Sequence, residues 1–431
     1  MSFSKKTIRD IDIRGKRLLI RTDYNVPVDA HGVVTDDRKL RASLATIQYA
    51  LEQDAAIILC SHLGRPEGTA RAELSLFPIA KRLQELLGRE ITFVPECVGE
   101  RAAKATSSCQ PGQIVLLENL RFDAREESND DAFAAQLAGY ADIFVQDGFA
   151  VAYRRHASVE AITHHLQSVA GLLVENELRS LETVISSTAA RPIIAVIGGE
   201  RVAETFALLD QVLHTADVVA VGGPMAAAFL HEMGVATGST KIIDEDKPLV
   251  HQLLATVAEQ RRERGLAFVL PYDAVVARSD TASASTRIVD WSAHVIADIE
   301  SYPKRPLHEA SQVAADEQIL DIGPFTGAYL AGLTQFAGTV VWCGALGRTD
   351  VIGQRGPVGP FAHGSELLVE ALSGQFGKRP AYTVVAGDDA TAYIENRGLL
   401  DIFDHISTGG GASLEVLAGR SLVGVDALED I

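Results

Sequence analysis

Short apolar runs recur along the chain, and each one leads directly into glycine, histidine or charged residues. In RLLIRTDYNVP, residues 17–27, a run suited to a buried strand is followed by Arg21, Asp23 and Asn25. β-Branched runs of this length predict short buried strands. The same pattern returns in AAIILCSHLGRP, QIVLLENLRF, DIFVQDGFAVAYRRH, RPIIAVIGGERV, DVVAVGGPM, LAFVLPYDAVVA, TVVWCGALGR and AYTVVAGDDA.

Between these runs lie amphipathic stretches with helical spacing, such as SLATIQYALEQ, SLFPIAKRLQELL and AFAAQLAGY. Strands that alternate with helices indicate parallel sheets covered on both faces. In open sheets of this kind, ligands bind outside the carboxyl ends of the strands. We therefore expect the polar residues that follow the strands to share one edge of each sheet.

A chain of 431 residues with 47% hydrophobic residues is too long for one core and suits two domains. Residues 173–189 place Val174, Leu178, Leu181 and Ile185 at helical spacing. The predicted fold is therefore α/β: two doubly wound, Rossmann-like parallel-sheet domains, residues 1–172 and 190–405, joined by a hinge helix at 173–189.

The net charge of −18 argues against a nucleic-acid or anionic-membrane partner, because either would require a basic face. The four cysteines have no metal-ligand spacing, and no apolar segment resembles a signal peptide or a membrane helix. These features predict a cytoplasmic protein with reduced thiols.

In the first half of the chain, the predicted strand ends carry cations and polar groups. Several arginines on one edge are costly to bring together unless an anion lies between them, and the arginine fork suits phosphate and carboxylate. This half therefore predicts an anion site. Its residues are Arg21, Asp23, Asn25, His62, Arg65, Arg121, Arg154, Arg155 and His156.

In the second half, the strand ends are rich in glycine, which lets backbone amides approach phosphate oxygens at helix amino termini. Several such loops predict a nucleotide site, and an anion site facing it across a hinge would suit phosphoryl transfer. The glycines are Gly198, Gly199, Gly222, Gly223, Gly344, Gly347, Gly387 and those of STGGGAS at 407–413.

Seven segments resemble, in order and spacing, the signature segments of the phosphoglycerate kinase family. They cover nearly the whole chain: RTDYNVP, SHLGRPEG, LLENLRF, HASVEAI, LPYDAVVA, DIGP and HISTGGGASLE. The resemblance implies transfer of a phosphoryl group between 1,3-bisphosphoglycerate and magnesium ADP, in a hinge-bending, usually monomeric enzyme. It also implies that residues 1–172 bind the acid, that 190–405 bind the nucleotide, and that 406–431 return to the N-terminal domain.

Carried over by motif, the resemblance assigns roles to individual residues. It implies an acid site of Asp23, Asn25, His62, Arg65, Arg121 and Arg154. It implies catalytic roles for Lys39, Arg201, Gly409 and Gly410. It implies a nucleotide site of Gly199, Gly223, Asp350, Gly387, Asp388 and Asp389, with Mg²⁺ associated with Asp389 and ATP or ADP as co-substrate.

The sequence also departs from the family pattern. Lys39, preceded by Arg38, stands where the family has an arginine, and Tyr153 replaces a histidine beside Arg154. Lysine keeps the charge but loses the two-pronged geometry. On the nucleotide side, Arg201 and Thr205 stand where the family has lysines, and further differences are Pro224, Phe325, Cys343 and Ala390.

Three hypotheses follow from these matches and departures. The first is a diverged, working phosphoglycerate kinase. The second is a related carboxylate kinase for another phosphorylated or phosphonylated acid, which Tyr153 and Lys39 motivate. The third is a noncatalytic binding or regulatory protein, which Thr205, Phe325, Pro224 and Ala390 motivate.

Overall fold

The structure is a computed structural model that describes residues 3–186, 188–291, 312–354, 356–380 and 382–431. The chain forms two compact units. Unit 1 comprises Met1–Arg179, Gly411–Val416 and Arg420–Ile431, and unit 2 comprises Ser180–Gly410 and Leu417–Gly419. Each unit is built on a six-stranded parallel sheet, which confirms the predicted α/β fold class.

The sheet of unit 1 has the strand order β3-β4-β2-β1-β5-β6, and every neighbouring pair is parallel. Its central strands are buried along almost their whole length, as expected for a sheet covered on both faces. The strands are β1 Arg17–Arg21, β2 Ala56–Cys60, β3 Ile91–Val94, β4 Ile114–Leu117, β5 Ile143–Gln146 and β6 Gln167–Ala170.

Helices cover the sheet of unit 1 through apolar stripes at helical spacing. In α1, for example, Leu40, Ile47 and Ala50 are fully buried while the opposite face is exposed. The helices are α1 Arg38–Glu52, α2 Phe77–Leu87, α3 Glu100–Ser108, α4 Ala124–Glu127, α5 Asp131–Ala138 and α15 Val423–Asp426.

The main sheet of unit 2 has the order β15-β14-β13-β7-β8-β9 and is also parallel. Its central strands β7, β13 and β14 hold the core residues Val196, Trp342 and Val385. The strands are β7 Ile193–Ile197, β8 Val218–Val221, β9 Ala267–Val269, β13 Thr339–Cys343, β14 Tyr382–Ala386 and β15 His405–Ile406.

Unit 2 also contains a second sheet, which the sequence analysis did not predict. Strands β11 Thr286–Asp290, β10 Asp273–Ala277 and β12 Gln318–Ile322 form an antiparallel ladder in that order. The apolar run at residues 266–277 is therefore two strands, β9 and β10, in different sheets. Pro271 lies between them, and proline interrupts a strand because it has no N–H to donate.

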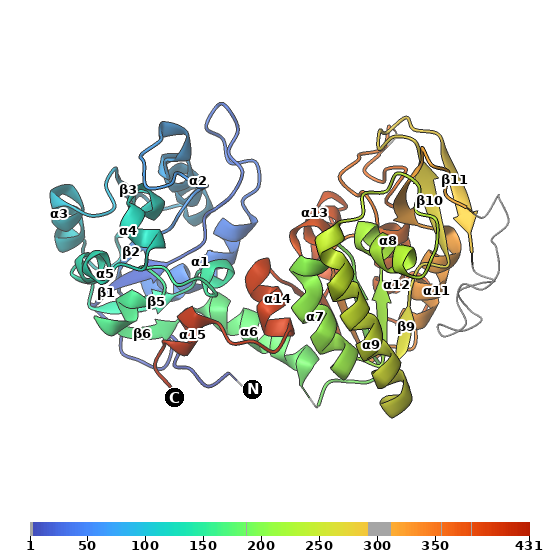
Figure 1. Cartoon of the computed structure of the whole chain (residues 1–431). Coiled ribbons are helices and arrows are strands. Elements are labelled where there is room, and N and C mark those ends of the chain that lie inside the picture. The colour runs from blue at the N-terminus through green and yellow to red at the C-terminus, as the bar shows by residue number, and fades with distance from the viewer. Residues whose placement is uncertain (1–2, 187, 292–311, 355, 381) are drawn as a thin grey trace. The chain divides into compact units, whose positions relative to one another are not determined.

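In unit 2, helices α7 and α9 pack against each other, as do α11 and α12 (Figure 1). The helices are α7 Val202–Thr215, α8 Gly223–Glu232, α9 Lys247–Arg264, α11 Pro324–Thr334, α12 His363–Leu372 and α13 Asp388–Asn396. Two more helices, α6 Leu172–Ile185 and α14 Gly411–Leu417, each have residues in both units. Helix α6 occupies most of the stretch for which a hinge helix is predicted.

The two ends of the chain lie together in unit 1 (Figure 1). The backbone N–H of Lys6 donates to the carbonyl of Glu429 at 2.8 Å, and Lys5 Nζ lies 2.8 Å from the carboxylate of Asp430. The residues after 419 thus complete the unit that the first residues begin. Within the described residues, we find no helix long and apolar enough to cross a bilayer.

Candidate active site

The loops after β1 and β2 are joined by hydrogen bonds among predicted site residues. Asp23, two residues beyond β1, accepts the backbone N–H of Asn25 at 2.9 Å and the Lys39 ammonium group at 2.8 Å. Asn25 in turn accepts the backbone N–H of Gly64 from the loop after β2 at 2.9 Å. His62 Nδ1 lies 3.8 Å from the Asp23 carboxylate. The structure therefore brings these side chains to one edge of the unit 1 sheet, which we call the acid rim.

Of the two neighbouring cations at the start of α1, only Lys39 faces the acid rim. Arg38 is turned to Asp36, with Nη2 at 2.6 Å from its carboxylate. The ammonium group of Lys39 instead contacts Asp23, which is itself almost fully buried. This arrangement supports Lys39 as the residue that takes the place of the family's arginine.

The remaining arginines of the acid rim differ in their environments. Arg65 is exposed, and among the described residues it forms no ion pair. Arg154 is half-buried, and its guanidinium lies 4.8 Å from the ring centre of Tyr153. Arg121 is buried; it donates to the carbonyl of Gly64 at 2.8 Å, and its Nε lies 3.2 Å from the carboxylate of Glu127, in an ion pair without hydrogen-bond geometry. The rim thus presents cations with donors left for an anion.

Two histidines near these arginines are neutral at pH 7. Burial and the charges of Arg21 and Arg121 hold the pKa of His62 well below its usual range, although Asp23 acts in the opposite direction. Burial, followed by the charges of neighbouring arginines, lowers the pKa of His156 to about 3. The positive charge of the acid rim therefore comes from arginine and lysine.

Arg21 differs from the expectation of an exposed cation at the strand end. Its side chain is fully buried, and Nε donates to the hydroxyl of Ser158 at 2.8 Å. The guanidinium also lies 3.9 Å from Glu126, which is fully buried as well. Arg21 therefore belongs to a buried ion pair that supports the acid rim from within.

In unit 2, glycines bring the loops after the parallel strands close together. Gly199, Gly223 and Gly387 have φ values of 132°, 67° and 87°, a region that other residues rarely adopt. A Cβ at Gly198 would lie 2.0 Å from the carbonyl oxygen of Ala345, so only glycine fits there. These loops lead into α7, α8 and α13, whose amino termini carry the partial positive charge that favours phosphate.

A cavity of about 150 Å³ lies among these loops. Three predicted nucleotide-site residues line it, namely Gly199, Asp350 and Asp389, whereas Gly223, Gly387 and Asp388 are not among the lining residues. Its described lining is Gly199, Glu200, Pro224, Ala345, Gly347, Arg348, Thr349, Asp350 and Asp389. Sequence reasoning missed Glu200, Arg348 and Thr349, although each lies in a glycine-containing loop that follows a predicted strand.

Carboxylates dominate the charge around this cavity. Burial, together with the negative charges of Asp388, Glu200 and Asp350, raises the pKa of Asp389. Within the described residues, no group of three or more histidine, cysteine, aspartate or glutamate side chains is arranged to hold a metal by itself.

The predicted catalytic residues of unit 2 lie around the cavity without lining it. Arg201 immediately precedes α7, and its guanidinium lies 3.7 Å from Asp246. A Cβ at Gly410, just before α14, would lie 3.6 Å from a carboxylate oxygen of Asp388, and Gly409 donates its N–H to the Ser407 hydroxyl at 3.2 Å. The predicted glycine loop and the start of α13 are therefore neighbours.

Thr205, which stands where the family has a second lysine, is buried and does not line the cavity. Its hydroxyl donates to the sulfur of Met225 at 3.0 Å. The charge that a lysine would bring to this position is thus missing, and a hydroxyl that packs in the protein interior takes its place.

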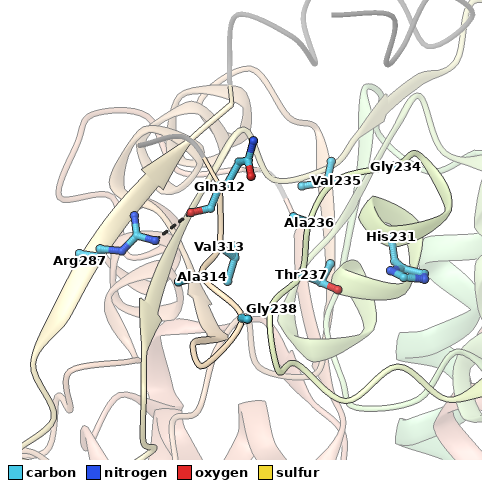
Figure 2. A pocket seen from close by; sticks show the side chains of 11 residues that line it. His231, Gly234, Val235, Ala236, Thr237, Gly238, Arg287, Gln312, Val313 and Ala314 are labelled. Carbon is cyan, nitrogen blue, oxygen red and sulfur yellow. Dashed lines mark hydrogen bonds between the residues drawn. The ribbon is translucent and has the colours of Figure 1, made fainter. Parts of the chain in front are cut away.

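A second, more open cavity of about 750 Å³ contains none of the predicted site residues (Figure 2). It lies between the loop after α8 and the segment that leads into β12. Its arginine, Arg287, is held by Glu317 and by the carbonyl of Gln312 at 2.8 Å (Figure 2).

One α/β unit of this protein carries a cationic rim, and the other carries a glycine-lined cavity. This combination is typical of enzymes that transfer a phosphoryl group, and comparison with known proteins supports that class. Residues 8–420 match the sequence profile of the phosphoglycerate kinase family, and the chain belongs to that family.

Curated relatives and solved structures match over nearly the whole chain. Phosphoglycerate kinase from Chloroflexus aurantiacus is 39% identical over 429 residues, covering 99% of both chains. The protein of the same name from Thermomicrobium roseum is 40% identical over 423 residues, covering 98% of this chain and 99% of that one. The structure of phosphoglycerate kinase from Coxiella burnetii superposes with a TM-score of 0.79 at 31% identity, and that from Pyrococcus horikoshii OT3 with 0.80 at 26%, each covering 98% of both chains.

Proposed function

We propose that this protein transfers a phosphoryl group between ATP and the carboxylate of 3-phosphoglycerate, giving 1,3-bisphosphoglycerate and ADP, and catalyses the reverse reaction. In the forward direction, a carboxylate oxygen attacks the γ-phosphorus, and the bond from that phosphorus to the β,γ-bridging oxygen breaks. The observation that carries the proposal is the acid rim. Its loops hold Asp23, Asn25 and His62 together beside arginines that have donors left for an anion.

The acid rim suits a small molecule that carries both a phosphate and a carboxylate. Arg65 and Arg154 form no ion pair with a described carboxylate, whereas the buried Arg121 is paired with the exposed Glu127 at 3.2 Å. Charge-assisted hydrogen bonds from arginine to phosphate or carboxylate are among the strongest that proteins form. Lys39, already oriented by Asp23, would supply a positive charge near the group in transfer.

The nucleotide cavity suits magnesium ADP better than free ADP. A polyphosphate entering beside Glu200, Asp350 and Asp389 meets three carboxylates and one arginine, so a divalent cation is needed to balance the charge. Mg²⁺ commonly binds through one or two carboxylates, with phosphate oxygens and waters completing its coordination. Asp389, at the start of α13, is the residue that we propose for this role.

Further features belong to the proposal. We propose that unit 1 binds the acid, that unit 2 binds the nucleotide, and that the enzyme acts as a monomer in the cytoplasm. The four cysteines are buried and free, which supports a reducing compartment.

Two alternatives are each favoured by a specific observation. Tyr153 places an exposed ring against Arg154, which would reshape the acid pocket for a different phosphorylated or phosphonylated acid. The buried Thr205 and the acidic cavity, with Pro224 in its lining, favour a noncatalytic binding protein that has lost nucleotide affinity. Measuring substrate preference distinguishes the first alternative from the proposal, and measuring nucleotide binding distinguishes the second.

The decisive experiment measures acyl phosphate formed by the purified protein from magnesium ATP and 3-phosphoglycerate. Hydroxylamine displaces phosphate from the acyl phosphate and leaves a hydroxamate, which is quantified. Lys39→Ala removes the charge beside the transferred group, and we expect kcat to fall by about two to three orders of magnitude. Lys104→Ala, which alters an exposed lysine on α3, is the matched control and should leave kcat unchanged.

Hydroxamate formation that depends on Lys39 would support the proposal. If the protein binds magnesium ATP but forms no hydroxamate, the substrate is another carboxylic acid. Absence of both product and nucleotide binding would support the noncatalytic alternative.

A further inference from the structure

Among the described residues that line the nucleotide cavity, Arg348 is the one that carries a positive charge. It lies in the loop after β13, directly beyond Gly347, and its side chain is partly exposed. The resemblance to known kinases assigns it no role. The same lining includes Gly199 and Asp389, which belong to the proposed nucleotide site.

Two carboxylates hold the Arg348 guanidinium in place. Nε and Nη2 each donate to Asp350 at 2.8 Å in a two-pronged pair, and Nη1 donates to Asp280 at 3.0 Å. A guanidinium has five N–H donors, so these three hydrogen bonds leave two donors, one on each terminal nitrogen. Arg348 can therefore contact a ligand without giving up either carboxylate.

This arrangement orients Arg348 before any ligand arrives. Hydrogen bonding to Asp350, together with the charges of Asp350, Asp280 and Glu200, raises its pKa further, so the group stays charged. A side chain that is already fixed loses little conformational entropy on binding.

We propose that Arg348 is a phosphate-binding residue of the nucleotide site, which donates its two remaining N–H groups to a phosphate oxygen of the nucleoside diphosphate. This inference rests on the proposed function. Arg348 supplies a cation that the cavity lining otherwise lacks, because Thr205 stands in place of a lysine and the other charged groups in the lining are carboxylates. The planar fork of arginine matches phosphate geometry.

The test compares binding of magnesium ADP and of adenosine by isothermal titration calorimetry. Arg348→Met removes the donors. The double variant Arg348→Met with Asp280→Asn removes one positive and one negative charge, so the net charge is that of the wild type. Arg379→Met is the control, because Arg379 lies before β14, outside the cavity lining, and is paired with Asp404 at 3.1 Å.

We expect Arg348→Met to weaken binding of magnesium ADP about tenfold to a hundredfold, the range for loss of a charge-assisted hydrogen bond. Binding of adenosine should change less than twofold, because it has no phosphate. The double variant should bind magnesium ADP as weakly as the single variant. Arg379→Met should bind it like the wild type.

Three results would overturn the role of Arg348: unchanged binding of magnesium ADP, an equal loss for adenosine, or recovery in the double variant, which would show that only net charge matters. A wild-type protein that binds no magnesium ADP would overturn the proposed function and this inference together. Far-UV circular dichroism checks folding. If Arg348→Met does not fold, Arg348→Lys, which keeps the charge without the fork, should still weaken binding severalfold, and undiminished binding would contradict the proposal.

Discussion

The two sites of this protein differ in how they prepare for negatively charged ligands. The acid rim of unit 1 gathers cations, and two of them, Arg65 and Arg154, form no ion pair with a described carboxylate. The nucleotide cavity of unit 2 is lined by three carboxylates and one arginine, which carboxylates already hold. The acid rim is complementary to an anion by itself, whereas the nucleotide cavity becomes complementary to one only with a bound cation. Two sheets of the same parallel α/β type can therefore carry sites of opposite charge.

The largest expected effect concerns the buried ion pair beneath the acid rim. Arg21→Met leaves Glu126 buried without its partner, which should destabilise unit 1 by about 3–5 kcal/mol. Both tryptophans of the chain, Trp291 and Trp342, lie in unit 2, so tryptophan fluorescence reports that unit alone. We expect part of the denaturation curve followed by circular dichroism to shift to lower denaturant while the fluorescence midpoint stays unchanged.

The matched control in unit 2 is Arg397→Met. Arg397 pairs with Glu366 in a partly exposed setting, so its loss should cost at most about 1 kcal/mol. Burial raises the pKa of Glu126, and the contribution of a carboxyl with a raised folded-state pKa is lost as pH rises through that pKa. The Arg21→Met variant should therefore be less impaired at pH 5 than at pH 8. Equal losses in the two arginine variants would contradict the buried-pair interpretation.

We expect the binding of ADP to unit 2 to require magnesium and the binding of 3-phosphoglycerate to unit 1 not to require it. Without Mg²⁺, binding of ADP should weaken at least about tenfold, because three carboxylates repel the polyphosphate, whereas binding of 3-phosphoglycerate should be unaffected. Calorimetric titrations with and without a chelator measure both effects. Glu200→Gln should reduce the difference for ADP, and strong ADP binding in the chelator would show that the acidic lining does not face the ligand.

The histidines of the acid rim provide a test by pH. Burial and nearby arginines lower the pKa of His62 well below its usual range and that of His156 to about 3. Their NMR signals, identified through His62→Gln and His156→Gln, should not titrate between pH 8 and pH 5. A signal that shifts with a midpoint near pH 6.5 and disappears in either variant would show that the rim gains charge from histidine.

The smallest expected effect is at Tyr153. Tyr153→His restores the residue type of the family and removes the ring on which Arg154 lies. Cation–π contacts at exposed sites contribute about 0.5–1 kcal/mol, so KM for 3-phosphoglycerate should fall about two- to fivefold with little change in kcat. Initial-rate kinetics measure the change. A rise in KM would instead indicate that Tyr153 itself binds the acid and would favour a different natural substrate.

The alternation of apolar runs with amphipathic stretches, together with the chain length, was enough to predict two parallel-sheet domains and the sheet edges at which polar residues gather. Local pattern could not separate Arg21 from Arg65, because both lie at or beyond the end of an apolar run. The partners that bury Arg21 are distant in sequence; Ser158, for example, lies 137 residues further along the chain. The same limit applies to Arg348, whose partner Asp280 lies 68 residues earlier.

The antiparallel sheet was missed for a related reason. A buried strand in a parallel sheet and one in a small antiparallel sheet carry the same apolar pattern. The partners of β10 are β11 and β12, and β12 lies in a different part of the sequence. Sequence pattern thus predicts the strands and the edges where they end. The pairing of charges and strands that are distant in sequence can be seen only in the folded structure.

The union of both chain ends in unit 1 has a consequence for synthesis on the ribosome. Unit 2 lies almost wholly within Ser180–Gly410, so its residues emerge before those of 420–431, which unit 1 requires. Domains commonly fold as they emerge, beginning from the amino terminus. Unit 1 therefore emerges first but is completed last, because contacts such as the hydrogen bond from the N–H of Gly424 to the carbonyl of Ala152 form only after residues 420–431 have emerged. During translation the nascent protein should acquire its nucleotide cavity before its acid rim is secured, so a truncated product would bind nucleotide without holding a complete acid-binding unit.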